Sequence, residues 1–309
     1  MQNGAVSTFI TAPDGLRLHA LCYGPRSSPK LPVVCLPGLA RTAADFEALA
    51  AALAHDGAHP RRVIALDYRG RGRSDYDRNP ENYSLPVEVA DVLAVITALD
   101  AMPALFVGTS RGGILAMLLA AVRPTAIAGV VLNDIGPVIE PQGLMRIKGY
   151  VGKLPQPRNF EDGAEILRRL FHNQFPKLGH DDWLASARRA FKEENGRMVP
   201  TYDVRLAKTL EAINPDSSIP PLWNQFGALS AVPMMAIRGA NSDILSPATV
   251  AAMRARHAGL ETLEVADQGH APLLAEPDTI ARIAEFVGRC DRQRTPNNKN
   301  PAVTALPHQ

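Results

Sequence analysis

The residues best suited to chemistry in this chain form a short segment with a serine at its centre, Gly108-Thr-Ser-Arg-Gly112. An apolar run typical of a buried strand, 104–107, comes directly before it, and a run typical of a helix, 113–122, comes directly after it. At a tight strand-to-helix turn a serine hydroxyl stands clear of the sheet, and glycines on either side let strand and helix approach each other. The pattern therefore predicts that Ser110 is a nucleophile.

A serine hydroxyl needs a base to take its proton and an acid to orient that base. His270 and Asp243 each come just beyond an expected strand, at the edge where open α/β sheets place their working residues. We expect these two to serve Ser110 as base and acid. Asp134, which also follows an expected strand, is the rival acid, and His257, at the end of an expected helix, is the rival base.

The reaction also needs backbone donors for the oxyanion that forms when a serine attacks a carbonyl. One should be the N–H of Arg111, the residue after the nucleophile. The other should come from the loop after the first buried parallel strand, Leu36-Pro-Gly-Leu-Ala40, where the N–H of Leu39 is the best candidate.

Expected strands and helices alternate along most of the chain. This alternation predicts an α/β fold, with a parallel sheet covered by helices on both faces. The expected strands are 9–23 (a hairpin), 31–36, 62–66, 104–107, 128–132, 233–237 and 260–265, and the expected helices are 43–55, 86–99, 113–122, 247–257 and 277–290.

One stretch breaks the alternation. Residues 140–221 contain several short helical patterns, at 163–172, 181–194 and 202–212, and no convincing buried strand. We therefore expect a helical cap or lid inserted between two parts of an α/β core, 1–139 and 222–291. The composition of 292–309 cannot bury a core, so we expect a flexible C-terminal tail.

Taken together, these motifs resemble those of the α/β-hydrolase superfamily over about residues 9–290. The resemblance rests on Leu36-Pro-Gly-Leu-Ala-Arg-Thr42, Asp67-Tyr-Arg-Gly-Arg-Gly-Arg-Ser-Asp75, Gly108-Thr-Ser-Arg-Gly-Gly113 and Gln268-Gly-His270, the second matching the family's D-x-R-G-x-G-x-S loop. It implies a mostly parallel eight-stranded sheet and the chain order serine, acid, histidine. It also implies the capped branch of esterases, enol-lactonases, perhydrolases and carbon–carbon bond hydrolases.

The chain departs from the family pattern at one position. The usual His-Gly before the oxyanion residue is here Pro37-Gly38, which removes a loop-bracing hydrogen bond. At the nucleophile position, haloalkane dehalogenases and epoxide hydrolases carry aspartate, and dienelactone hydrolases carry cysteine. Ser110 argues against all three.

The sequence thus predicts a serine carboxylesterase that cleaves a small, hydrophobic ester or lactone through an acyl-enzyme, with no metal or organic cofactor. The alternatives are carbon–carbon bond hydrolysis of a vinylogous diketone and a non-catalytic, ligand-binding hydrolase fold. Two arginines near the reaction centre could recognise a substrate carboxylate, or could face solvent or pair with nearby acids. The expected substrate-binding residues are these arginines, Arg41 and Arg111, and four pocket walls, Tyr150, Phe171, Trp183 and Trp223.

Composition excludes several other classes of function. The net charge of +2 with scattered arginines gives no electrostatic basis for nucleic-acid binding, and no run of about 18 apolar residues predicts a membrane span. The first residues lack a secretory pattern, so we expect a cytoplasmic protein. The three cysteines are too far apart for a zinc site or a disulfide framework. The expected partner is a small-molecule substrate, and the sequence predicts no particular oligomeric state.

Overall fold

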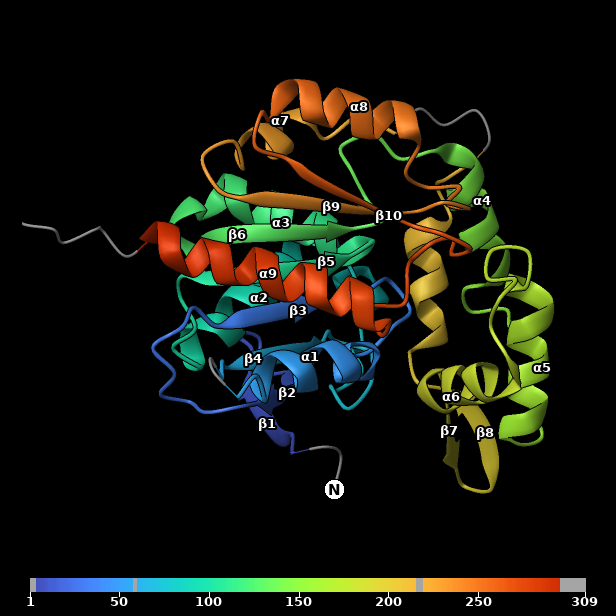
Figure 1. The fold of residues 1–309 in the computed structure, drawn as a ribbon. Helices are drawn as coiled ribbons and strands as arrows, with labels where there is room; N and C mark the ends of the chain where they lie inside the picture. Colours follow the sequence, from blue (N-terminus) through green and yellow to red (C-terminus); the bar gives the residue numbers. More distant parts are fainter. Residues whose placement is uncertain (1–3, 58–59, 215–218, 295–309) are drawn as a thin grey trace, which may run out of the picture.

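The strands build a single eight-stranded sheet in the order β1-β2-β4-β3-β5-β6-β9-β10 (Figure 1). The structure is a computed structural model and describes residues 4–57, 60–214 and 219–294. β1 and β2 pair antiparallel, as do β2 and β4, and every pair from β4 to β10 is parallel. The predicted mostly parallel sheet is confirmed. The strands are β1 Val6–Thr11, β2 Arg17–Tyr23, β3 Val33–Leu36, β4 Val63–Asp67, β5 Ala104–Thr109, β6 Ile127–Asn133, β9 Met234–Gly239 and β10 Glu261–Val265.

Helices cover both faces of the sheet because the central strands are apolar on both sides. In β5, Leu105 and Val107 belong to the core beneath α1 and α9, whereas Ala104 and Phe106 belong to the core beneath α2, α3 and α8. This alternation follows from the two-residue period of a strand. The helices are α1 Glu47–Ala54, α2 Leu85–Ala98, α3 Arg111–Val122, α8 Pro247–Arg256 and α9 Pro277–Arg294, with short 3₁₀ helices at Ala43–Phe46, Pro80–Asn82 and Pro124–Ala126.

The C-terminal helix is longer than predicted. α9 continues to Arg294, so residues 292–294 are helical and not part of a tail. The remaining tail prediction, 295–309, lies outside the described residues. None of the helices formed by the described residues is long and apolar enough to cross a membrane.

Residues 140–221, which we call the insertion, lie between β6 and β9 in the chain. Figure 1 shows most of the insertion as a group beside the sheet. α5, α6 and the β7–β8 hairpin share a small core of their own that includes Leu167, Trp183 and Phe191. The elements are α4 Pro141–Tyr150, α5 Phe160–Phe171, α6 His180–Ala190, β7 Phe191–Glu194, β8 Arg197–Pro200 and a 3₁₀ helix Val204–Leu210; α7 Trp223–Gly227 follows.

The insertion is not all helical, which corrects the prediction. The helix expected over 181–194 ends at Ala190, and the chain continues as the antiparallel hairpin β7–β8. Asn195 and Gly196 form its turn with φ of 52° and 71°. Asn-Gly is the residue pair that adopts such a turn most readily, so this pair marks the hairpin in the sequence.

The two ends of the insertion lie close together. The N–H of Leu222 donates to the carbonyl of Pro137 at 2.7 Å. Nearby, the N–H of Glu140 donates to the carbonyl of Ile244 at 3.0 Å, which fixes the start of α4 to the loop after β9. The insertion therefore leaves and rejoins the sheet at one place.

Candidate active site

Ser110 occupies the turn between β5 and α3 in a strained backbone conformation, with φ 51° and ψ −115°. The turn is tight because the adjoining backbones touch. A Cβ on Gly112 would lie 2.0 Å from the Leu36 carbonyl oxygen, and a Cβ on Gly108 would lie 2.6 Å from Gly112. Only glycine fits at these two positions, so the sequence pattern around Ser110 has the expected structural cause.

His270 lies between the serine and a buried carboxylate. Its Nε2 is 2.8 Å from Ser110 Oγ, and its Nδ1 is 2.7 Å from Oδ2 of Asp134. A carboxylate only accepts hydrogen bonds, so Nδ1 donates to it and Nε2 is left to accept from the serine hydroxyl. The insertion contributes as well, because Gln174 Oε1 accepts from the His270 backbone N–H at 3.0 Å.

Asp134 follows β6 directly, and two donors hold its carboxylate. It has left-handed backbone, with φ 54°, and its side chain is fully buried. Oδ1 accepts from the N–H of Gly239 at 2.9 Å, and Oδ2 also accepts from the hydroxyl of Ser242 at 2.6 Å. The carboxylate is therefore fixed in place before it meets His270.

The structure corrects the predicted pairing of Asp243 with His270. Asp243 instead accepts two hydrogen bonds from Arg146 of α4, at 2.6 and 2.7 Å. Burial alone would raise the pKa of Asp243, but the guanidinium outweighs it and lowers the pKa. Asp243 thus ties the insertion to the loop after β9, and the rival acid Asp134 takes the place beside the imidazole.

His257, the rival base, is remote from these groups. It follows α8, and its Nε2 lies 3.1 Å from the carbonyl oxygen of Val232. His270 alone of the two candidates contacts Ser110.

The predicted oxyanion loop lies against Ser110. A Cβ on Gly38 would come within 3.8 Å of the Ser110 Cβ. Within the described residues, neither the N–H of Leu39 nor the N–H of Arg111 has a hydrogen-bond acceptor. Leu39 belongs to this loop and lines the same pocket as Ser110, and Arg111 follows Ser110 directly, so both N–H groups remain candidates for the oxyanion donors.

Both arginines near the reaction centre pair with acids. Arg41 donates to Asp45 through Nε and Nη2, at 2.7 and 2.9 Å. Arg111 donates to buried Glu88 at 2.6 Å, so its guanidinium points away from the serine. Arg189 of the insertion also contacts Asp45, with its Nε 3.3 Å from Oδ1.

A pocket of about 500 Å³ opens beside Ser110 and His270 between the sheet and the insertion. Three of the predicted walls, Tyr150, Phe171 and Trp183, line it, and the Arg41–Asp45–Arg189 cluster lies among its lining residues. The fourth predicted wall is wrong: Trp223 packs edge-on against Phe226, with Arg256 stacked on its ring at 4.0 Å. The pairing of Asp45 with Arg189 could not be predicted from the sequence, because it depends on how the insertion folds back.

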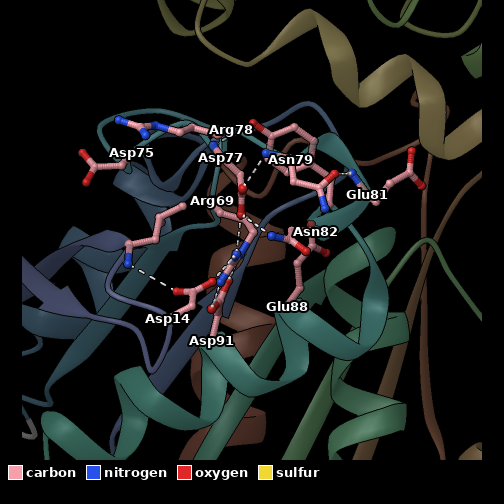
Figure 2. Close-up of polar contacts among 12 residues, drawn as sticks. Asp14, Arg69, Asp75, Asp77, Arg78, Asn79, Glu81, Asn82, Glu88 and Asp91 are labelled. Carbon is pink, nitrogen blue, oxygen red and sulfur yellow. Dashed lines mark hydrogen bonds and ion pairs between the residues drawn. The ribbon is translucent and has the colours of Figure 1, made fainter.

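The D-x-R-G-x-G-x-S loop is a buried ionic cluster behind the site. Figure 2 shows Arg69 contacting three carboxylates, Asp14, Asp77 and Asp91, at 2.6 to 2.8 Å. Three carboxylates around one buried guanidinium fix the loop to the N-terminal hairpin and to α2. The loop therefore acts as a rigid support. Its residue Arg71 contacts the carbonyl of Leu39 in the oxyanion loop.

The fold and these residues define a hydrolase of the α/β class, and comparison with known proteins agrees. Residues 33–283 match the model of the alpha/beta hydrolase family, and the chain belongs to that family. It is 32% identical over 287 residues to the 3-hydroxybutyrate-oligomer hydrolase of Cupriavidus necator, covering 90% of this chain and 96% of that protein.

Two further relatives are also hydrolases. A crystal structure of an alpha/beta hydrolase from Novosphingobium aromaticivorans superposes with a TM-score of 0.85 at 38% identity, covering 93% of this chain and 99% of that one. The 2-(acetamidomethylene)succinate hydrolase of Mesorhizobium japonicum is 25% identical over 228 residues, covering 73% of this chain and 78% of that protein.

Proposed function

We propose that this chain is a serine hydrolase of carboxylic esters, with Ser110 as nucleophile, His270 as general base and Asp134 as the acid that holds the imidazole. The supporting observation is the continuous line of contacts from Ser110 Oγ through the His270 ring to Asp134, at 2.8 and 2.7 Å. Such a line lets the hydroxyl pass its proton to Nε2 as it attacks, while the carboxylate stabilises the imidazolium.

The reaction proceeds through an acyl-enzyme. Ser110 Oγ attacks the ester carbonyl, and the N–H groups of Leu39 and Arg111 bind the oxygen that becomes negative. The alcohol leaves with the proton held by His270, and an acyl group remains on the serine. Water then gives a proton to the same Nε2 and attacks the acyl group, and the proton returns to Ser110 as the carboxylic acid departs.

The substrate class that we propose is a short oligoester of a hydroxy acid. The Cupriavidus necator relative is named for hydrolysis of 3-hydroxybutyrate oligomers and aligns over 90% of this chain. The pocket of about 500 Å³ has space for a short chain, and Phe171 and Trp183 give it apolar walls. The Arg41–Asp45–Arg189 cluster offers donors and acceptors that suit repeated ester and hydroxyl groups.

The direct test compares 3-hydroxybutyrate dimers and trimers with p-nitrophenyl esters of increasing acyl length, together with lactones and a vinylogous diketone. Ser110→Ala should lower turnover by about 10⁴-fold or more. Ser230→Ala, at an exposed serine far along the chain, is the matched control and should leave it unchanged. A fluorophosphonate should add to the wild-type protein and not to Ser110→Ala, as read by mass spectrometry.

The outcomes test the proposed mechanism and the proposed substrate separately. Unchanged ester turnover in Ser110→Ala would contradict the proposed mechanism. A wild-type protein that hydrolyses p-nitrophenyl esters but not the oligomers would keep the mechanism and overturn the oligoester substrate.

A further inference from the structure

Three consecutive carbonyls of the oxyanion loop are each held by a donor. The Pro37 oxygen accepts from the hydroxyl of Tyr68 at 3.2 Å, the Gly38 oxygen accepts from the N–H of Arg41 at 3.3 Å, and the Leu39 oxygen accepts from Nε of Arg71 at 2.8 Å. The Leu39 N–H belongs to the peptide of the Gly38 carbonyl and points opposite to it, because the peptide is planar and trans. Fixing these carbonyls therefore fixes the direction of the Leu39 N–H.

Two of the three donors, Tyr68 and Arg71, belong to the D-x-R-G-x-G-x-S loop. Both occupy positions at which the pattern specifies no residue type. Arg71 is fully buried, and its guanidinium carbon lies 5.4 and 5.7 Å from the ring centres of Tyr68 and Tyr83. Its Nη1 donates to the Arg69 carbonyl at 2.7 Å. These contacts hold the side chain of Arg71 against the Leu39 carbonyl.

A single carboxylate joins this support to the nucleophile turn. Glu88 of α2, fully buried, places Oε1 2.8 Å from Nη1 of Arg71 and accepts at Oε2 from Nε of Arg111 at 2.6 Å. Arg111 also donates to the Tyr83 carbonyl at 3.0 Å. Figure 2 shows Glu88 on α2 beside the cluster around Arg69.

We propose that Glu88, through Arg71 and Arg111, positions both oxyanion donors, and that Tyr68 and Arg71 brace the oxyanion loop where the family's usual histidine is replaced by Pro37. This inference rests on the proposed serine hydrolase reaction. These side chains are positioning residues: they touch the peptides that carry the donors and not the substrate. Their contribution should appear in the transition state, where the oxygen is anionic, and not in binding of the uncharged ester.

The choice of variants follows from burial. Glu88→Gln would leave two buried guanidinium groups with one neutral partner, a change that should destabilise the fold and obscure any effect on catalysis. Arg71→Lys keeps the charge for Glu88 but cannot reach both the carboxylate and the Leu39 carbonyl. Tyr68→Phe removes one hydroxyl only. Tyr23→Phe is the matched control, because the Tyr23 hydroxyl is buried without a partner among the described residues and belongs to the opposite core.

The experiment measures kcat and KM on a p-nitrophenyl ester and the inhibition constant of an alkylboronic acid, whose serine adduct places a tetrahedral oxygen at the oxyanion position. Loss of a whole oxyanion donor costs about 10² to 10³-fold in kcat. Misplacing one should cost about 10- to 100-fold in Arg71→Lys and about 3- to 10-fold in Tyr68→Phe. KM should stay nearly constant, and the boronic acid should weaken in proportion to kcat/KM. Tyr23→Phe should match the wild type.

The results distinguish the two proposals. If the wild type hydrolyses the ester while folded Arg71→Lys and Tyr68→Phe keep its kcat and boronic acid affinity, the positioning role is overturned and the serine mechanism stands. If losses in kcat are matched by Tyr23→Phe, a general packing effect overturns it as well. An inactive wild type that no fluorophosphonate labels would overturn both.

Discussion

Replacing Asp134 with asparagine is the sharpest test of which acid holds the imidazole. An asparagine has one oxygen where Asp134 has two, each already accepting from a donor. If the asparagine oxygen still accepts from the N–H of Gly239, its amide nitrogen faces Nδ1 of His270 and donates to it. The ring must then carry its proton on Nε2, where it can no longer accept from Ser110.

The magnitude follows from this loss of the correct tautomer. In the serine proteases that serve as the general template, the same substitution lowers kcat by about 10⁴-fold, equivalent to about 5.4 kcal/mol of activation free energy. We expect a loss of that order in Asp134→Asn. Asp243→Asn is the matched control: its carboxylate pairs with Arg146, so kcat should change by less than about tenfold.

The assay is steady-state hydrolysis of a p-nitrophenyl ester, with active-site concentrations taken from the fluorophosphonate-reactive fraction and folding checked by thermal unfolding. The reasoning would be refuted if folded Asp134→Asn retained kcat within tenfold of the wild type. A loss of about 10⁴-fold in Asp243→Asn instead would restore the pairing expected from the sequence.

Three further predictions concern the turn, the insertion and the pocket. Gly112→Ala should lower the free energy of unfolding by about 3 kcal/mol or more because its Cβ meets a carbonyl oxygen at 2.0 Å. Gly149→Ala, exposed on a helix with open space around it, should raise it by up to about 1 kcal/mol in the same urea titration, and equal effects would contradict the steric argument. The folded-state pKa of Asp243 lies below its ordinary value of 3.8, so its ion pair stabilises the fold at neutral pH and this contribution is lost as pH falls through the folded pKa. The stabilities of wild type and Asp243→Asn, measured by urea unfolding, should therefore converge toward acid, and parallel pH curves would count against the ion pair. Phe171→Ala should shift the preferred acyl length in the ester series and Trp223→Ala should not; a shift in both would place the second ring at the pocket after all.

The sheet and the tight turn at Ser110 could be predicted because their causes are local. β3, β4 and β5 are continuous apolar runs, as strands buried on both faces must be. The glycines around Ser110 follow from backbone contacts within a single strand-turn-helix unit. Sequence patterns report such short-range constraints well.

The acid could not be chosen from the sequence, because Asp134 and Asp243 follow neighbouring parallel strands and both reach the same edge of the sheet. What separates them is distant in the chain. Arg146, on a helix of the insertion, forms an ion pair with Asp243. The Gly239 N–H and the Ser242 hydroxyl donate to Asp134. The position of Trp223 likewise depends on contacts between segments, because Arg256 of α8 stacks on its ring outside the pocket.

Because the N–H of Leu222 donates to the carbonyl of Pro137, the two ends of the insertion lie one hydrogen bond apart. The insertion could therefore be exchanged as a unit. A segment from another member of the family, with equally close ends, would join here without stretching either flanking strand. Such an exchange would change what enters the pocket and leave the nucleophile untouched. The graft would have to bring two side chains of its own, a guanidinium for Asp243 and an amide for the backbone of His270.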